Sequence, residues 1–327
     1  MMKKIVVTGA FGHLGINLVL SLNAQGIIPR ALVHNKTLDI IKVDPIKGDV
    51  NDLESLKKCF AGAEIVYHLA SKISLFEKDD AALRRVNVDG TRNVIDACLH
   101  NKVKRLVYIS SIRAFNTELS DETLTETRSL VETHQGFSYD RSKADGVRLV
   151  ENAIQHGLDA VMIFPPGIIG PHDYNLSPMT QFFLDLYHEK LPVLLEGNCH
   201  CVDIQDLVAM IISAGEKGRN GERYILGGHR ILIRELAKIV HEITGKKIPK
   251  IYLPIKLVST LAPMLRLYAR IMNVNESNAM TSKMALNSLS LGEVSSHKAM
   301  QDLGYSPRSI RETIETTFAW FAKIGWI

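Results

Sequence analysis

The stretch KIVVTGAFGHLG, residues 4–15, decides the fold of this 327-residue chain. A short apolar run ends at Thr8, and glycines follow at positions 9, 12 and 15 before an apolar, helix-like segment begins. Glycine lets the chain turn sharply from strand to helix and lets its backbone approach a ligand without Cβ atoms in the way. The free N–H groups of the first helical turn can then bind an anion. The spacing therefore predicts a loop that binds the pyrophosphate of a dinucleotide, rather than a plain tight turn.

Outward from this stretch, short apolar runs alternate with helix-like segments through the first 170 residues. The apolar runs are Lys4–Val7, Ile28–Val33, Ile65–Leu69, Arg105–Ile109 and Ala160–Ile163. The helix-like segments are Leu14–Asn23, Leu53–Phe60, Ala81–His100 and Tyr139–His156. Strands that are apolar on both faces and alternate with helices predict an α/β fold, in which helices cover both sides of a doubly wound parallel (Rossmann) sheet.

The pattern loosens after residue 170, where loops, scattered prolines and isolated helix-like pieces follow. A chain of this length is long enough for about two domains. We therefore expect a dinucleotide-binding Rossmann domain over residues 1–170 and a smaller C-terminal substrate-binding lobe over 171–327. Residues 202–226 are expected to return to the first domain.

Composition and charge exclude several classes of protein. The net charge of +4 is small and evenly spread, which argues against a nucleic-acid partner. No uninterrupted apolar stretch of about 20 residues is present, so we expect no integral membrane segment. The first apolar run is too short for a secretory signal. The four cysteines lack the spacing of a redox or zinc motif and are too few for a disulfide scaffold, which predicts a cytoplasmic protein.

A candidate catalytic constellation begins at the segment YDRSK, residues 139–143, which opens a helix-like segment. Tyr139 and Lys143 are four residues apart and share one helix face. Because a nearby ammonium group stabilises a phenolate, we expect Lys143 to lower the pKa of Tyr139. The lysine can also hold the nicotinamide ribose. A serine of the pair Ser110–Ser111, which follows a predicted strand, is expected to polarise the substrate oxygen.

The residues after the second predicted strand bear on the choice of cofactor. An acidic residue here would accept hydrogen bonds from the ribose 2′-hydroxyl of NAD. Arg30, His34 and Lys36 stand here instead, and no acid comes before Asp39. Hydrogen-bond donors of this kind suit a 2′-phosphate, so we expect NADP, with NAD as the alternative. For Lys36, an ordinary solvated loop position is the other interpretation.

The chain resembles the extended short-chain dehydrogenase/reductase family (the NAD-dependent epimerase/dehydratase family), and in particular its dihydroflavonol-4-reductase-like branch. The matching elements are the glycine loop, Gly48–Val50, His68–Ala70, Val86–Thr91, Ser110–Ser111, Tyr139–Lys143, Pro165–Pro171, Val202–Asp206, Gly221–Tyr224 and Gly227–Gly228. The resemblance implies that Ser111 is the catalytic serine and that a homodimer forms through residues 81–100 and 139–156. It also implies that Asp49 and Val50 contact the adenine, and that residues 166–168 flank the nicotinamide. The residues expected to contact the cofactor are Gly9, Phe11, Gly12, His13, Leu14, Gly15, His34, Lys36, Asp49, Val50, Leu69, Ala70, Ser71, Lys143, Pro166, Gly167 and Ile168.

Two departures from the family pattern narrow the predicted function. Phe164 stands before the proline pair, where the family often has an arginine, and is expected in the core. The stretch Glu196–Cys201 lacks the arginine with which nucleotide-sugar members commonly grip a diphosphate. We therefore expect an NAD(P)-dependent oxidoreductase that reduces the carbonyl, or oxidises the alcohol, of a small or medium-sized substrate. The alternatives are a nucleotide-sugar epimerase or dehydratase with tightly bound NAD, and a non-catalytic NAD(P)-sensing regulator.

Three short segments have a possible functional and a plain structural interpretation. The run Cys199–Asp203 contains metal-ligand side chains, but alternation along a strand would send His200 to the opposite face, so no metal site is expected. The segment His172–Tyr174 either faces the substrate or forms an ordinary loop. Met179–Leu186 is expected to belong to the core.

Residues 251–272 are apolar but carry three cationic residues. We expect a helix that packs on the second lobe, with contact to a membrane surface as the alternative. Tyr252 and Lys256 repeat the Tyr-x-x-x-Lys spacing within this segment. Because Pro254 between them disfavours a helical turn, this second copy is not expected to be catalytic.

Overall fold

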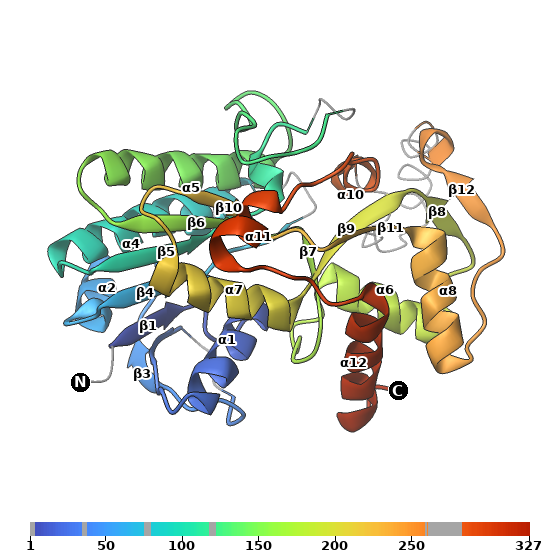
Figure 1. The fold of residues 1–327 in the computed structure, drawn as a ribbon, viewed down its shortest axis with the longest axis horizontal. Helices are drawn as coiled ribbons and strands as arrows, with labels where there is room; N and C mark the ends of the chain where they lie inside the picture. Colours follow the sequence, from blue (N-terminus) through green and yellow to red (C-terminus); the bar gives the residue numbers. More distant parts are fainter. Residues whose placement is uncertain (1–3, 35–37, 75–79, 118–121, 259, 261–282) are drawn as a thin grey trace.

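The computed structural model describes residues 4–34, 38–74, 80–117, 122–258, 260 and 283–327. Figure 1 shows two parts side by side, a large sheet between two layers of helices and a smaller assembly of short strands and helices. No helix in the described part of the chain is long and apolar enough to cross a bilayer.

The large sheet has seven parallel strands in the order β3-β2-β1-β4-β5-β6-β10. The strands are β1 (Ile5–Thr8), β2 (Arg30–Val33), β3 (Asp44–Lys47), β4 (Ile65–His68), β5 (Arg105–Ile109), β6 (Ala160–Phe164) and β10 (Arg223–Ile225). The predicted α/β doubly wound fold is therefore confirmed, and the five predicted apolar runs form β1, β2, β4, β5 and β6. Strand β3 was not predicted, because this polar edge strand contains Pro45 and has no apolar run.

Helices cover both faces of the sheet (Figure 1). One layer contains α1 (His13–Ala24) and α7 (Ile204–Lys217). The other contains α2 (Leu53–Phe60), α4 (Gly90–His100) and α5 (Ser138–Gln155). Each layer encloses its own cluster of buried apolar side chains against the sheet, and Phe164, expected in the core, is fully buried in the second of them.

The predicted helix-like segment at 81–100 is helical throughout, but a π-helical turn interrupts its α-helical geometry. It consists of α3 (Asp80–Arg84), a π-helical turn η2 (Arg85–Asp89) and α4. The Asn87 side chain points away from this turn and forms hydrogen bonds with residues 71 and 72 of the loop after β4. Periodicity alone does not reveal such a π-turn, and these turns are often found at functional sites.

The C-terminal part is built on short strands. A three-stranded sheet contains β7 (Gly167–Ile169), β9 (Asn198–Asp203) and β11 (His229–Leu232), and β8 (Leu194–Glu196) pairs with β12 (Tyr252–Pro254). Among the described residues its helices include α6 (Pro178–Tyr187), α8 (Ile233–Thr244), α10 (Lys283–Ser288) and α12 (Ile310–Lys323), whereas α11 (His297–Leu303) packs against α7 and β10 of the large sheet. Phe183, Leu184 and Leu186 of α6 are buried in this part, as expected of a core helix.

Residues 202–226, which we expected back at the large sheet, divide between the two sheets. Helix α7 packs on the large sheet and β10 joins it as an edge strand. Strand β9, in contrast, pairs with β7 and β11 of the small sheet. Of the apolar segment 251–272, residue 259 and residues 261–272 lie outside the described residues. Tyr252 is in a strand, so the second Tyr-x-x-x-Lys copy does not form a helical turn.

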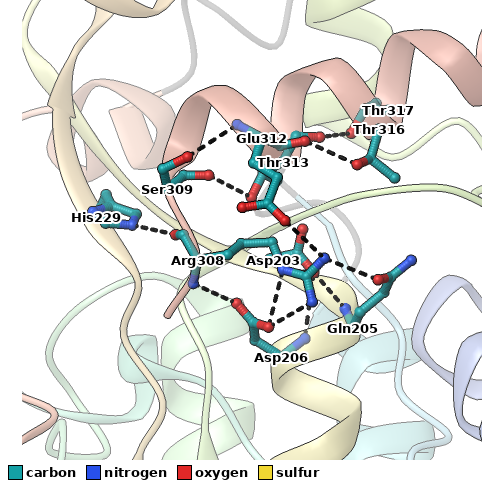
Figure 2. Close-up of polar contacts among 10 residues, drawn as sticks. All are labelled: Asp203, Gln205, Asp206, His229, Arg308, Ser309, Glu312, Thr313, Thr316 and Thr317. Atoms are coloured by element: carbon teal, nitrogen blue, oxygen red, sulfur yellow. Dashed lines mark hydrogen bonds and ion pairs between the residues drawn. The ribbon is translucent and has the colours of Figure 1, made fainter. Parts of the chain in front are cut away.

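A joint formed by the polar contacts of Arg308 with Asp203 and Asp206 connects the start of α12 to the start of α7 (Figure 2). The Arg308 guanidinium donates to Asp206 Oδ1 from Nε at 3.0 Å and from Nη2 at 2.8 Å, and the Arg308 backbone N–H donates to Asp206 Oδ2. Asp203 caps α7, and its Oδ1 lies 3.5 Å from Arg308 Nε. The start of α12, which follows Ser309, is thereby held against the start of α7.

Candidate active site

The glycine loop has a shape that side chains would prevent. Gly9 has a φ of +74°, and a Cβ atom here would lie 2.6 Å from the backbone nitrogen of Ala70. A Cβ atom at Gly15 would lie 2.1 Å from the carbonyl oxygen of Gly9. Gly12 closes the turn by donating its N–H to Gly9, and as the N-cap of α1 it supplies no side-chain hydrogen bond. A tight turn that leads into a helix without a side-chain cap fits a bound pyrophosphate.

The loop after β4 lies directly against this turn. The Ala70 N–H points to the hydroxyl of Thr8 at 3.4 Å, and the Leu69 N–H donates to the Thr8 carbonyl oxygen. Ser71 Oγ donates to Asn87 Oδ1 at 3.0 Å. The structure thus brings Leu69, Ala70 and Ser71 to the same edge of the sheet as the glycine loop.

A second segment, residues 171–175, supports the glycine loop from the other part of the molecule. His13 Nε2 lies 3.1 Å from the carbonyl oxygen of Pro171, and Asn175 donates to the carbonyl oxygen of Phe11. Asp173 is fully buried and accepts hydrogen bonds from the backbone N–H groups of residues 175 and 177. Of the two interpretations of His172–Tyr174, these contacts favour a structural loop.

The Ser–Tyr–Lys trio gathers between β5 and α5. Ser111 comes two residues after the end of β5, while Tyr139 and Lys143 lie in the first two turns of α5. All three side chains are buried. Lys143 Nζ donates to the carbonyl oxygen of Ile109 at 3.2 Å. The rival Ser110 has a buried Oγ without a hydrogen-bond partner in the described part of the chain.

Burial, rather than the charge of Lys143, has the largest effect on the pKa of Tyr139. Burial raises the pKa of Tyr139 to about 12, although a hydrogen bond with Ser111 and the charge of Arg113 oppose this shift. Burial also lowers the pKa of Lys143 to about 7. The expectation that Lys143 lowers the pKa of Tyr139 is therefore wrong for the protein without its cofactor, because desolvation of the phenolate outweighs the favourable charges.

The residues expected at the adenosine end are partly brought together. His34 Nε2 lies 3.2 Å from Asp49 Oδ2, just beyond the ends of β2 and β3, and the buried Val50 follows. Arg30 is at the opposite end of β2, where it pairs with Asp44, so its inclusion in a 2′-phosphate pocket is wrong. Lys36 lies outside the described residues.

The residues expected beside the nicotinamide lead from the large sheet into the small one. Pro166 follows β6, while Gly167 and Ile168 begin β7. A Cβ atom at Gly167 would lie 3.1 Å from the carbonyl oxygen of His200 in β9, so this glycine allows β7 and β9 to pack closely. Residues 166–168 therefore connect β6 of the large sheet to the smaller part.

Strand β9 has the alternation expected from its sequence. The sulfur atoms of Cys199 and Cys201 are 3.4 Å apart, whereas His200 Nε2 lies 2.7 Å from the carbonyl oxygen of Gly292. Among the residues that the structure describes, no group of three or more His, Cys, Asp or Glu side chains could hold a metal ion.

Sequence reasoning missed two polar features close to the candidate site. His68, at the end of β4, is buried between the hydroxyls of Thr8 and Thr91, and burial lowers its pKa to about 3. Arg113 and Asp140 form a buried ion pair beside the trio. The adjacency of Asp140 to Tyr139 and the closeness of Arg113 to Ser111 in the sequence were the available signals.

The doubly wound sheet and its glycine loop define an NAD(P)-dependent enzyme of the extended short-chain dehydrogenase/reductase type. The chain belongs to the NAD-dependent epimerase/dehydratase family, whose model matches residues 5–227, and this confirms the resemblance seen in the sequence.

Individual relatives agree with this assignment. Sterol demethylase protein B of Methylococcus capsulatus is 31% identical, with 98% of this chain and 99% of the relative covered. A putative dihydroflavonol 4-reductase of Synechocystis is 30% identical, with 98% and 95% covered. The structure of Thermus thermophilus UDP-glucose 4-epimerase in complex with NAD is 21% identical, with a TM-score of 0.79 and 98% and 99% covered. The likeness to this last structure supports the fold alone.

Proposed function

We propose that this protein is an NADP-dependent reductase of the carbonyl group of a small or medium-sized substrate, similar to dihydroflavonol 4-reductase. The observation that carries the proposal is the buried trio of Ser111, Tyr139 and Lys143 at the edge of the sheet that also carries the glycine loop. The similarity to a putative dihydroflavonol 4-reductase over 98% of the chain supports the reaction type.

The side chains have separate roles in this proposal. The nicotinamide cofactor, when bound, supplies the hydride, for which the chain has no equivalent group. Tyr139 holds a proton at Oη, and its pKa of about 12 keeps that proton in place at neutral pH until the substrate oxygen gains negative charge. Ser111 donates a hydrogen bond to the same oxygen. Lys143 holds the ribose of the bound nucleotide.

The preference for NADP rests on the end of β2. His34 and Lys36 supply hydrogen-bond donors for a 2′-phosphate, whereas Asp49, 3.2 Å from His34, is an acid that favours the 2′-hydroxyl of NAD. Titrations of the purified protein with NADPH and NADH would separate the two, and tighter binding of NADH would reverse the preference. The homodimer and the cytoplasmic location stay predictions.

The experiment that tests the function is a carbonyl substrate screen with the wild type and Tyr139→Phe. We expect turnover to fall by roughly 10²- to 10⁴-fold while NADPH affinity changes little, because only the proton donor is lost. Tyr252→Phe is the matched control, since Tyr252 belongs to the second Tyr-x-x-x-Lys copy in β12, and it should keep full activity.

The alternatives make different predictions for the same screen. Retained NAD together with turnover of a nucleotide sugar would favour an epimerase or dehydratase. Tight NADPH binding without turnover of any carbonyl or nucleotide sugar would favour the non-catalytic regulator.

A further inference from the structure

A buried arginine lies between three elements of the candidate site. Arg113, in the short helical turn η3 (Ile112–Ala114), is only 7% exposed, and Asp140 is 2% exposed. Arg113 Nε donates to Asp140 Oδ1 at 2.9 Å, and Nη2 donates to Asp140 Oδ2. A buried ion pair needs all its partners, because removal of one leaves the other charge desolvated.

The pair holds together the two backbone segments that carry Ser111 and Tyr139. The Arg113 N–H donates to Ser111 Oγ at 3.2 Å, and Asp140 immediately follows Tyr139 in the first turn of α5. Asp140 Oδ2 also accepts the N–H of Phe137, the N-cap of α5, at 3.5 Å. A small shift of either segment would therefore change the relative placement of the serine and the tyrosine.

The third contact reaches the C-terminal part of the molecule. Arg113 Nη1 donates to Asn287 Oδ1 in α10 at 2.6 Å. Met284, one helical turn before Asn287, packs with Leu83 and Tyr139 in a small apolar cluster. Helix α10 therefore lies on the catalytic tyrosine, and this contact helps to leave Tyr139 only 7% exposed.

We propose that Arg113 is a positioning residue that holds α10 over Tyr139 while it fixes the segments that carry Ser111 and Tyr139. This role rests on the proposed function for its effect on turnover, although the attachment of α10 is independent of it. A lysine could not replace the arginine, because one ammonium group cannot reproduce the bidentate contact with Asp140 and reach Asn287 as well.

The charges around Tyr139 give the proposal a second readout. Asp140 raises the pKa of Tyr139 and Arg113 lowers it, and Tyr108 is a further titratable group that interacts with Tyr139. Loss of the Arg113 charge leaves Asp140 unbalanced, so the pKa of Tyr139 should rise further. Loss of Asn287 leaves the ion pair intact, so this pKa should not change.

The experiment compares Arg113→Lys, Arg113→Met and Asn287→Ala with Arg105→Met as the matched control. Arg105 also makes a bidentate pair, with Asp159, but it begins β5 at the opposite end from Ser111. Each variant is measured for kcat, KM, NADPH affinity, the pH profile of alcohol oxidation, and hydrogen exchange of residues 283–288.

We expect Arg113→Lys to lower kcat roughly 10- to 100-fold, with NADPH affinity nearly unchanged. In Arg113→Met, which loses the charge, the low-pH limb of the oxidation profile, where Tyr139 must lose its proton to act as the base, should move to higher pH. Asn287→Ala should speed hydrogen exchange in α10 and change KM several-fold, without moving the pH profile. Arg105→Met should leave the kinetics and α10 exchange as in the wild type.

Folded Arg113→Lys and Asn287→Ala proteins with wild-type kinetics and wild-type exchange in α10 would overturn the proposal. So would an Arg105→Met protein that loses as much activity as Arg113→Lys. If Tyr139→Phe proves fully active, the proposed function fails, and the exchange of residues 283–288 still decides whether Arg113 and Asn287 hold α10. Because Arg113→Met can fail to fold, the lysine and Asn287 variants are the ones that decide between these outcomes.

Discussion

The large sheet and the C-terminal joint around Arg308 are held together in different ways. Strands β1, β4 and β6 are buried along their whole length, and the sheet contributes to two apolar clusters, one on each face. The joint instead depends on one partly exposed arginine whose main partner, Asp206, is 102 residues away in the sequence. The sheet is therefore stabilised by many small apolar contributions, and the joint by a few specific polar contacts.

The two regions should tolerate different substitutions. Apolar burial is spread over many residues, so single conservative changes in the sheet cost little unless backbone contacts such as those of Gly15 are involved. In the joint, the loss of one side chain removes several hydrogen bonds together and leaves Asp206 without its cation. Substitutions in the two regions should therefore differ in their effect on the free energy of unfolding.

The largest effect is expected from Gly15→Val in the glycine loop. A Cβ atom here would lie 2.1 Å from Gly9 O and 2.7 Å from the Cα of Ala10, so α1 must move away from β1. We expect NADPH binding to be lost and the free energy of unfolding to fall by about 3 kcal/mol or more. Calorimetric NADPH titration and urea unfolding measure both. Gly26→Ala is the control for cofactor binding, because its Cβ would have no neighbour within 4 Å. An equal loss of NADPH affinity in Gly26→Ala would contradict the prediction.

A smaller loss is expected from Arg308→Met at the joint. The substitution removes both guanidinium hydrogen bonds to Asp206 Oδ1 and leaves that carboxylate partly buried, which should cost about 2–3 kcal/mol of unfolding free energy. Arg311→Met is the matched control, because Arg311 pairs with Glu242 on the surface, and it should cost below about 1 kcal/mol. Equal losses in urea unfolding would show that the joint behaves as an ordinary surface pair.

The third prediction concerns the pH dependence of the large sheet through His68. Its pKa is about 3 in the folded protein and near 6.5 in the unfolded chain, so the unfolded chain takes up the proton as the pH falls. This contribution to stability is complete above about pH 6.5 and is lost at lower pH, reaching a deficit of about 2 kcal/mol at pH 5.

His68→Gln should remove this deficit, so the difference in unfolding free energy between pH 8 and pH 5 should shrink by about 2 kcal/mol. The exposed His156 supplies the comparison variant, His156→Gln, which should keep the wild-type dependence. An unchanged dependence in His68→Gln would contradict the assignment.

The smallest effects are expected at two helix caps, one in each region. Asp52 caps α2 and accepts the N–H of Glu54 at 3.1 Å, and Ser309 caps α12 and accepts the N–H of Glu312 at 3.2 Å. Replacement of either by alanine should cost about 1 kcal/mol. If Ser309→Ala costs as much as Arg308→Met in thermal unfolding, the guanidinium contacts add little to the joint.

The site could be predicted where residues follow one another in the sequence. The glycine loop, Ser111, Tyr139 and Lys143 each occur in short motifs, and their elements meet because the carboxyl ends of parallel strands share one edge. The prediction for Arg30 was wrong because Arg30 stands at the start of β2 rather than at its end. Its side chain bonds the carbonyl oxygen of Cys59, at the opposite edge of the sheet from the glycine loop.

The amino-acid sequence alone sufficed to predict the buried strands of the large sheet and the glycine loop, because strands buried on both faces leave a continuous apolar signal and glycine spacing is read directly from neighbouring residues, whereas the polar edge strand β3 leaves no such signal. Only the tertiary structure decided the pKa of Tyr139, the pairing of Arg113 with Asp140 and Asn287, and the joint at Arg308. Each depends on burial and on contacts between residues far apart in the chain, such as the 174 positions that separate Arg113 from Asn287. Desolvation and long-range hydrogen bonds are set by packing, and local periodicity does not encode them.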